Sequence, residues 1–346
     1  MIKPEIALKP EPSNLLRVVA TDTALLLIAG TLLIVGLVSF EQLTKTLAFT
    51  FETVTFLLPF LLFAFALAGF MKASSAEVII TQVFRGRAIA MVFAAAFFGA
   101  WSPLCSCTVI AMIAVLLRAG MPLSAVMAFW ISSPIISPDM YIYTAALLGT
   151  EFATAKLVAA MLMGIFAGFT VLFLEKLGGF KNPLKHHDSK KMSLGDAKKP
   201  VWKFWREPAR VEAFWAEVKD VTWRLGKWMI FAFILESLMI AYIPAGQVGE
   251  WVGNSTWAIP LAVIVGMPAY VNGVAAVPLI QGLLSMGMSQ PAAMAFLVGG
   301  SVTSIPAMMA VFPLVKFRVF MTYIAIALIS SMLIGYLYQL YLLSFN

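Results

Sequence analysis

Residues 113–129 read IAVLLRAGMPLSAVMAF, and residues 280–296 read IQGLLSMGMSQPAAMAF. Nine of these seventeen aligned positions are identical without a gap, at a constant offset of 167 residues. An offset of 168 also aligns the Phe-Ala-Phe sequences at 63–65 and 231–233. The offset of 167 pairs further identical small residues: Gly99 with Gly266, Ser137 with Ser304, and Gly168 with Gly335. We therefore expect two structural repeats in one chain.

The composition predicts the environment of these repeats. The 346 residues are 61% hydrophobic and only 12% charged, whereas an ordinary soluble domain carries about 25% charged residues. Apolar stretches long enough to cross a bilayer recur along the chain. They cover 23–40, 50–71, 88–118, 122–149, 152–176, 222–243, 257–286, 291–314 and 319–343. The predicted fold class is an all-α, polytopic helical membrane bundle with two inverted-topology repeats and broken half-helices.

The charges predict the orientation of the chain in the membrane. Nine Lys and Arg residues fall between 181 and 210, against three acidic residues, and the N-terminal segment is also basic. Because cytoplasmic loops collect Lys and Arg, we expect both segments on the cytoplasmic side of an inner membrane. The loop 72–87 is basic, but its counterpart at 244–256 contains Glu250 and no Lys or Arg. This opposite bias indicates that the two repeats are inverted.

We divide the chain accordingly into four parts. Residues 1–47 hold an extra N-terminal helix, and residues 48–177 form the first transmembrane repeat. Residues 178–221 form a basic cytoplasmic linker, whose Trp-rich end at 201–221 is typical of a helix lying at the membrane interface. Residues 222–346 form the second repeat.

Proline and serine interrupt several of the apolar stretches. Ser102-Pro103, Ser132-Ser133-Pro134 and Ser137-Pro138 fall inside them, and Pro removes a backbone donor and clashes with the preceding turn. We expect equivalent breaks in the second half, including one at Gly299-Gly300-Ser301. Broken backbone at membrane depth is tolerated where it is buried in protein or lines a cavity. These breaks therefore predict a substrate site between half-helices, near the bilayer midplane.

Cys105 and Cys107 are the two cysteines of the chain, and they follow the break at Pro103. Thiolates are ligands for soft ions such as Cu(I) and Zn(II), and trivalent arsenic is thiophilic by the same logic. On an intact helix residues i and i+2 diverge, but in a broken segment both sulfurs can reach one ion. The repeat offset places Asn272 opposite Cys105. The alternative is that both cysteines simply pack as small apolar residues.

A family resemblance accompanies these motifs. The stretch Gly99-Ala-Trp-Ser-Pro-Leu-Cys105-Ser-Cys107, followed by Gly120, Ala128-Phe129 and Ser133-Pro134-Ile-Ile-Ser-Pro138, resembles the predicted permease family that includes the ArsP organoarsenical efflux permeases. The second-half motif Gly266-Met-Pro268-Ala-Tyr270-Val-Asn272 is similar as well, and the resemblance extends over about 50–342. It implies efflux of trivalent arsenicals, with relatives assigned to copper or zinc export, and places Cys105 and Cys107 on the family's Cys-x-Cys. We expect Pro103, Ser106, Tyr270 and Asn272 to complete the binding site.

Two carboxylates are candidates for proton coupling. Glu236 lies inside the apolar stretch 222–243, and Asp139 follows the break at Pro138. Ionisable groups inside a membrane are functional candidates by default. No Gly-x-x-x-x-Gly-Lys-Ser/Thr loop for ATP is present in the sequence, so a gradient or a partner must supply energy.

The expected function is therefore an efflux permease for thiophilic trivalent arsenicals, bound by the Cys105 and Cys107 dithiolate and driven by proton antiport. It is not expected to be an enzyme, to hold a cofactor or to bind nucleic acid. Its expected partners are the lipid bilayer and a thiophilic small molecule or ion, and a homo-oligomer is left open. The alternatives are a copper or zinc exporter, and a membrane protein that uses the cysteine pair for thiol exchange, although redox pairs usually have Cys-x-x-Cys spacing.

Overall fold

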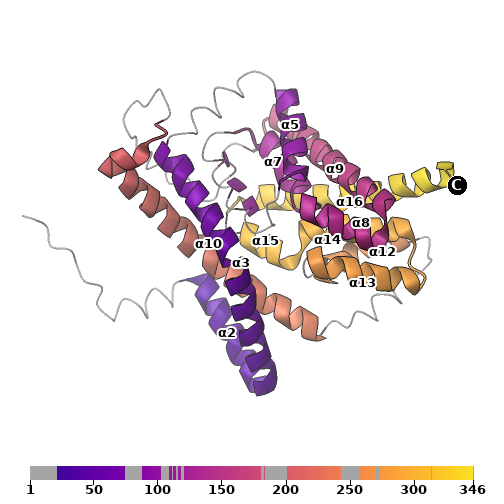
Figure 1. Ribbon diagram of the computed structural model, residues 1–346, viewed down its shortest axis with the longest axis horizontal. Coiled ribbons are helices and arrows are strands. Elements are labelled where there is room, and N and C mark those ends of the chain that lie inside the picture. The colour runs from indigo at the N-terminus through magenta and orange to yellow at the C-terminus, as the bar shows by residue number, and fades with distance from the viewer. Residues whose placement is uncertain are drawn as a thin grey trace, which may run out of the picture.

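The computed structural model describes residues 22–74, 88–102, 121–180, 201–242, 257–269, 273–312 and 314–345, with 109–110, 112–113, 116–117 and 183. The regular elements of these ranges are helices, which confirms the predicted all-α class (Figure 1). The first half contains α2 (Thr23–Val38), α3 (Phe40–Ser74), α5 (Ala88–Ala100), α7 (Leu123–Ser132), α8 (Pro138–Leu148) and α9 (Thr150–Lys176). The second half contains the short helix η1 (Phe204–Arg206), α10 (Pro208–Tyr242), α12 (Ala258–Ala269), α13 (Gly273–Ser285), α14 (Gln290–Thr303), α15 (Ile305–Val311) and α16 (Phe317–Phe345).

Each half builds the same three-helix unit. Helices α5, α7 and α9 pack against one another, and so do α12, α14 and α16 (Figure 1). A buried apolar cluster lies inside each unit, and the members of the two clusters correspond one to one at the offset of 167 residues. They are Val92, Ala96 and Ala128 in the first unit, and Ile259, Val263 and Ala295 in the second.

Glycine allows the same close helix contact in both units. A Cβ atom built on Gly168 of α9 would lie 2.5 Å from Cγ1 of Val92 on α5. A Cβ atom built on Gly335 of α16 would lie 2.6 Å from Cγ2 of Ile259 on α12. Both distances are too short for real carbon atoms, so only glycine fits at this crossing. Small residues of this kind let membrane helices approach closely, and the repeat seen in the sequence is therefore a repeat in the packing.

The long helices α3 and α10 lie side by side and run antiparallel (Figure 1). Ser237 of α10 donates a hydrogen bond to the hydroxyl of Thr46 on α3, at 3.2 Å. Further along α3, a Cβ atom on Gly69 would lie 2.9 Å from the ring of Phe214, which precedes Ser237 on α10. The offset of 168 pairs Thr46 with Phe214 and Gly69 with Ser237. The contact of Thr46 with Ser237 is therefore equivalent, in the repeat, to the contact of Phe214 with Gly69. Equivalent helices thus run in opposite directions, as inverted repeats require.

The N-terminal helix α2 is tied to the second repeat. Asp22 caps α2 by accepting a hydrogen bond from the backbone N–H of Ala24, at 3.2 Å. Its other carboxylate oxygen forms an ion pair with Lys227 of α10. Helix α2 packs on both α3 and α10, while its outer face leaves Leu33, Ile34 and Leu37 more than 60% exposed. Large exposed aliphatic side chains on an apolar helix are what a lipid-facing surface requires.

Three described segments are long and apolar enough to cross a membrane: Thr150–Lys176, Gln290–Met309 and Phe317–Ser344. Two of them, α9 and α16, occupy equivalent places in the repeats and also pack on each other. The ring of Phe152, near the start of α9, meets the ring of Tyr338, near the end of α16, edge to face at 5.8 Å. The chain is therefore a helical membrane protein whose two repeats share one core.

Several predicted helix limits are confirmed and two expectations change. Helix α5 ends before Pro103, and α7 and α8 are separated at 133–137, as the Ser-Pro breaks predict. The break expected at Gly299-Gly300-Ser301 is wrong, because α14 continues through these residues and the chain leaves it at Ser304. Gly299 instead allows a close helix contact, since a Cβ there would lie 3.3 Å from Ser331 of α16. Helix α10 also runs without interruption through 221–222, where we placed the boundary between linker and second repeat.

Candidate functional site

Buried residues lie near both ends of the segment that carries the cysteines. Pro103, Cys105, Ser106 and Cys107 lie outside the described residues. The last residue of α5, Ala100, is 1% exposed, and Val109, on the other side of the segment, is also 1% exposed. Trp101, the residue that follows Ala100, is 51% exposed.

The corresponding segment of the second repeat lies between α12 and α13. Tyr270 and Asn272 lie outside the described residues, between the end of α12 and the start of α13. The offset of 167 pairs Cys107 with Val274. Shortly after Val274, Ala276 and Val277 are 2% and 0% exposed. Buried residues therefore follow both segments: Val109 in the first repeat, and Ala276 and Val277 in the second. That they face each other across the membrane midplane stays a prediction.

The helices before the two segments are held by the same backbone contact. A Cβ atom on Gly99 of α5 would lie 2.9 Å from the carbonyl oxygen of Phe129 on α7. A Cβ atom on Gly266 of α12 would lie 3.1 Å from the carbonyl oxygen of Phe296 on α14. Each pair is related to the other by the offset of 167. The backbone that leads into each candidate segment is thus fixed against a neighbouring helix by a glycine.

The break between α7 and α8 is buried and polar. Ser132 donates its hydroxyl to the carbonyl of Ala128, at 2.9 Å. Ser133, which is 1% exposed, has no hydrogen-bond partner for its hydroxyl among the described residues, and neither has Thr144 on α8. Buried hydroxyl groups without partners are uncommon in folded proteins and call for an explanation. The break between α7 and α8 therefore offers hydroxyl groups that a substrate or water can use.

Glu236 is buried in α10 at 5% exposure. The structure gives its carboxylate no ion pair among the described residues, and the next residue, Ser237, bonds across to Thr46 of α3. Helix α10 also packs on α15, which follows the break at Ser304. A carboxylate in this position must be protonated or find a cation, because an isolated buried charge is very costly. Glu236 therefore has the setting that a proton-carrying residue needs.

Asp139 has a different setting. It is exposed and lies in the first turn of α8, after Ser137 and Pro138. The N-terminus of a helix stabilises a negative side chain in its first turn. Stabilisation of the α8 N-terminus is therefore enough to explain why a carboxylate occupies position 139.

Lys156 is a candidate that our sequence analysis missed. It lies in α9, is 1% exposed and has neither a hydrogen bond nor an ion pair among the described residues. The rule that intramembrane ionisable groups are functional by default, which selected Glu236 and Asp139, applies equally to Lys156 in the apolar stretch 152–176. The offset of 167 pairs Lys156 with Tyr323 of α16, which is also 1% exposed.

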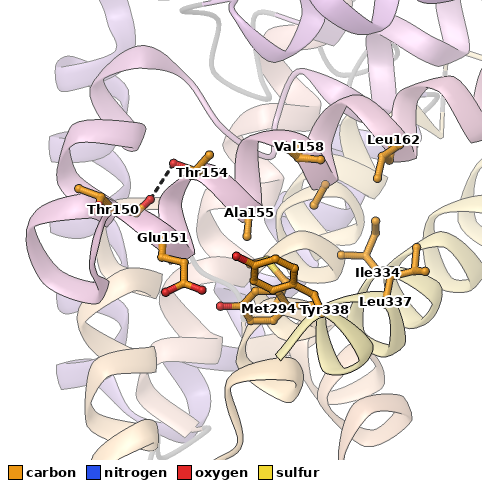
Figure 2. Close-up of a pocket in the computed structure, with 12 residues that line it drawn as sticks. Thr150, Glu151, Thr154, Ala155, Val158, Leu162, Met294, Ile334, Leu337 and Tyr338 are labelled. Carbon is orange, nitrogen blue, oxygen red and sulfur yellow. Dashed lines mark hydrogen bonds between the residues drawn. The ribbon is translucent and has the colours of Figure 1, made fainter. Parts of the chain in front are cut away.

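A cavity of about 530 Å³ lies between α9 and α16 (Figure 2). None of the candidate site residues chosen from the sequence is among the residues that line it. The described part of the chain also contains no group of three or more His, Cys, Asp and Glu side chains placed to hold a metal ion.

Comparison with known proteins agrees with this architecture. The model of the predicted permease family matches residues 42–340, from the start of α3 nearly to the end of α16. The UPF0718 protein MJ0584 of Methanocaldococcus jannaschii is 22% identical over 292 residues, covering 70% of this chain and 80% of that protein. No solved structure matches the chain. Because the family model covers most of the chain, including both repeats, this protein belongs to the predicted permease family.

Proposed function

We propose that this permease exports thiophilic trivalent arsenicals across the inner membrane and binds them through Cys105 and Cys107. The observation that carries the proposal is the placement of the only two cysteines in a Pro-interrupted segment bounded by the buried residues Ala100 and Val109. Two thiolates suit a monomethylated arsenic(III), which has two positions for exchange. The soft character of sulfur favours such a centre over hard ions.

The energy source in this proposal is a proton gradient, with Glu236 as the residue that carries the proton. Its exposed fraction of only 5% and the absence of a cation beside it among the described residues support the assignment. A carboxylate that alternates between protonated and ionised forms can neutralise the site when the substrate leaves. The exposed Asp139, at a helix N-terminus, is the weaker candidate.

The charges at the helix ends support the orientation in the inner membrane that this proposal assumes. Lys176 ends α9, and Lys316 and Arg318 lie at the start of α16, so one end of this antiparallel pair is basic. The positive-inside rule assigns that end to the cytoplasm. The linker that follows α9 is then cytoplasmic as well.

Protection of the cysteines from alkylation tests the substrate. The purified full chain is treated with a maleimide reagent after incubation with methylarsenite, arsenite, Cu(I) or Zn(II). We expect methylarsenite to protect Cys105 and Cys107 together at the lowest concentration. Protection by Cu(I) or Zn(II) alone would replace the arsenical with a metal ion as the substrate. Oxidation of both thiols by a disulfide donor without any protection would instead support thiol exchange.

Resistance measured in cells completes the test. Cys105→Ser and Cys107→Ser each remove one thiolate and change the packing little, so both variants should remain in the membrane and lose resistance to methylarsenite. A matched control is Ser285→Ala, whose exposed hydroxyl bonds only to the carbonyl of Gly282 in its own helix. If either cysteine variant protects cells as well as the wild type, the dithiolate mechanism is wrong.

A further inference from the structure

The cavity between α9 and α16 is amphipathic along its length (Figure 2). Its polar end lies at the start of α9, and its apolar end lies deeper along both helices, as the labelled side chains in Figure 2 show. The polar end is lined by Thr150, Glu151 and Thr154. The apolar end is lined by Leu162, Ile334 and Leu337. The cavity is therefore shaped for a molecule with a polar head and an apolar tail.

The polar end is suited to a cationic head group. Glu151 lies in the first turn of α9, and no Lys, Arg or His lines the cavity. The described residues give Glu151 no ion pair, and its charge lies within electrostatic reach of Tyr338. The rings of Tyr338 and Tyr341 stack at 6.1 Å with a 13° tilt. A carboxylate beside aromatic rings is the combination that binds an ammonium group.

The apolar end opens toward the bilayer. Val158, Leu162 and Leu337 are 48%, 45% and 53% exposed, and they lie on two helices that are long and apolar enough to span the membrane. Such side chains face the hydrocarbon of the bilayer, because lipid tails solvate them. An aliphatic chain can therefore enter the cavity sideways from the membrane.

The residues equivalent to the cavity's polar lining differ in charge and type. At the offset of 167, Glu151 corresponds to Arg318 and Tyr341 corresponds to Leu174. The acidic and aromatic lining is thus specific to one end of the α9 and α16 pair. Lys176, Lys316 and Arg318 lie at the other end, so the positive-inside rule places the cavity's polar end at the outer leaflet.

We propose that this cavity, called the groove below, binds one aminolipid of the phosphatidylethanolamine type from the outer leaflet. Its ammonium group lies against the Glu151 carboxylate and the Tyr338 ring. The hydroxyl group of Thr150, which also lines the cavity, donates to the lipid phosphate. One acyl chain follows the aliphatic wall from Val158 to Leu337, which joins the last helices of the two repeats.

Native mass spectrometry of the full-length protein tests this site. The protein is reconstituted in nanodiscs that contain equal amounts of phosphatidylethanolamine and phosphatidylglycerol with identical acyl chains, and is then released into the gas phase. We expect the wild type to retain one phosphatidylethanolamine in preference to phosphatidylglycerol. Glu151→Gln should lower that retention about three- to fivefold, the range for a partly exposed ion pair. Glu52→Gln, which changes an exposed carboxylate of α3 outside the groove, should leave it unchanged.

Three outcomes would overturn the assignment. Equal retention of both lipids by the wild type would show that the groove does not select an ammonium group. Unchanged selectivity in Glu151→Gln, or an equal loss in Glu52→Gln, would show that Glu151 does not hold the head group. Preferential binding of soluble dodecyltrimethylammonium, added to the same nanodiscs, with no retained phosphatidylethanolamine would assign the groove to a free lipophilic cation instead.

Discussion

The indole ring of Trp130 stacks on the phenol ring of Tyr323, with ring centroids 4.4 Å apart and planes tilted by 17°. Trp130 belongs to α7 of the first repeat and Tyr323 to α16 of the second, and both are nearly fully buried. The Tyr323 hydroxyl also donates to the backbone carbonyl of Val302 near the end of α14. Four residues after Val302 stands Pro306, which has no N–H to offer that carbonyl. One tyrosine thus joins the repeats and completes the backbone hydrogen bonds at a helix break.

Removing the hydroxyl of Tyr323 separates these two roles. Tyr323→Phe keeps the stack on Trp130 but leaves the Val302 carbonyl without its donor, and should lower the free energy of unfolding by about 1–2 kcal/mol. Tyr323→Ala also loses the buried ring and should cost about 3–5 kcal/mol. Thermal unfolding in detergent measures both changes. Tyr336→Phe, an exposed tyrosine of the same helix, is the control, and a Tyr323→Phe protein as stable as the wild type would contradict the role of the hydroxyl.

Alanine substitutions at two glycines should change the stability of the protein in opposite directions. One of these glycines, Gly99, lies where α5 closely approaches α7. Gly99→Ala places a Cβ 2.9 Å from the Phe129 carbonyl oxygen, a backbone atom that cannot move aside, and should destabilise the protein by about 1–3 kcal/mol. Gly282→Ala in α13 meets nothing within 4 Å and should stabilise by about 0.5–1 kcal/mol. The difference between the two melting temperatures measures the contrast. Equal effects at both sites would mean that the α5–α7 contact is not tight.

The repeat and its glycines are predictable from sequence, because an inverted repeat keeps the residues that fix helix crossings. Gly168 and Gly335 are identical at the offset of 167, and both lie where a side chain would collide. Gly299 shows the limit of this reasoning, because a glycine can break a helix or let two helices touch, and only the position of Ser331 decides. The length of α10 was also missed, since charged residues at 207–220 favoured a surface helix over a continuation into the span.

The candidate site was predictable only in its chemistry. Residue types select Cys105, Cys107 and Glu236, but the contacts that give Tyr323 its role come from α7 and α14, far away in sequence. Lys156 was overlooked, although the rule that selected Glu236 and Asp139 applies equally to a lysine in the apolar stretch 152–176. Burial, which the sequence does not give, is what distinguishes Glu236 and Lys156 from the exposed Asp139.

Replacing Lys156 should separate stability from transport. Lys156→Met keeps the length of the side chain and removes an unpaired buried ammonium group, so it should stabilise the protein by about 2 kcal/mol. Transport should fall at the same time, because a costly buried charge at the equivalent of Tyr323 is retained for function. Melting temperature and vesicle transport are measured on the same preparation. Lys156→Arg, which keeps the charge, should preserve more transport than Lys156→Met, and full activity of Lys156→Met would leave the lysine without a functional role.

Proton coupling should depend on Glu236 more than on Asp139. Glu236 is buried without a described cation, whereas Asp139 is exposed in the first turn of α8, where the helix N-terminus stabilises its charge. Glu236→Gln holds this side chain permanently neutral, so uptake of methylarsenite into everted vesicles should slow and no longer respond to the proton gradient. Asp139→Asn should keep that response.

The measurement compares initial uptake rates with and without an uncoupler, and Glu52→Gln serves as an exposed-carboxylate control. If wild-type uptake ignores the uncoupler, the proton gradient is not the driving force; if Glu236→Gln keeps the wild-type rate and response, another residue carries the proton.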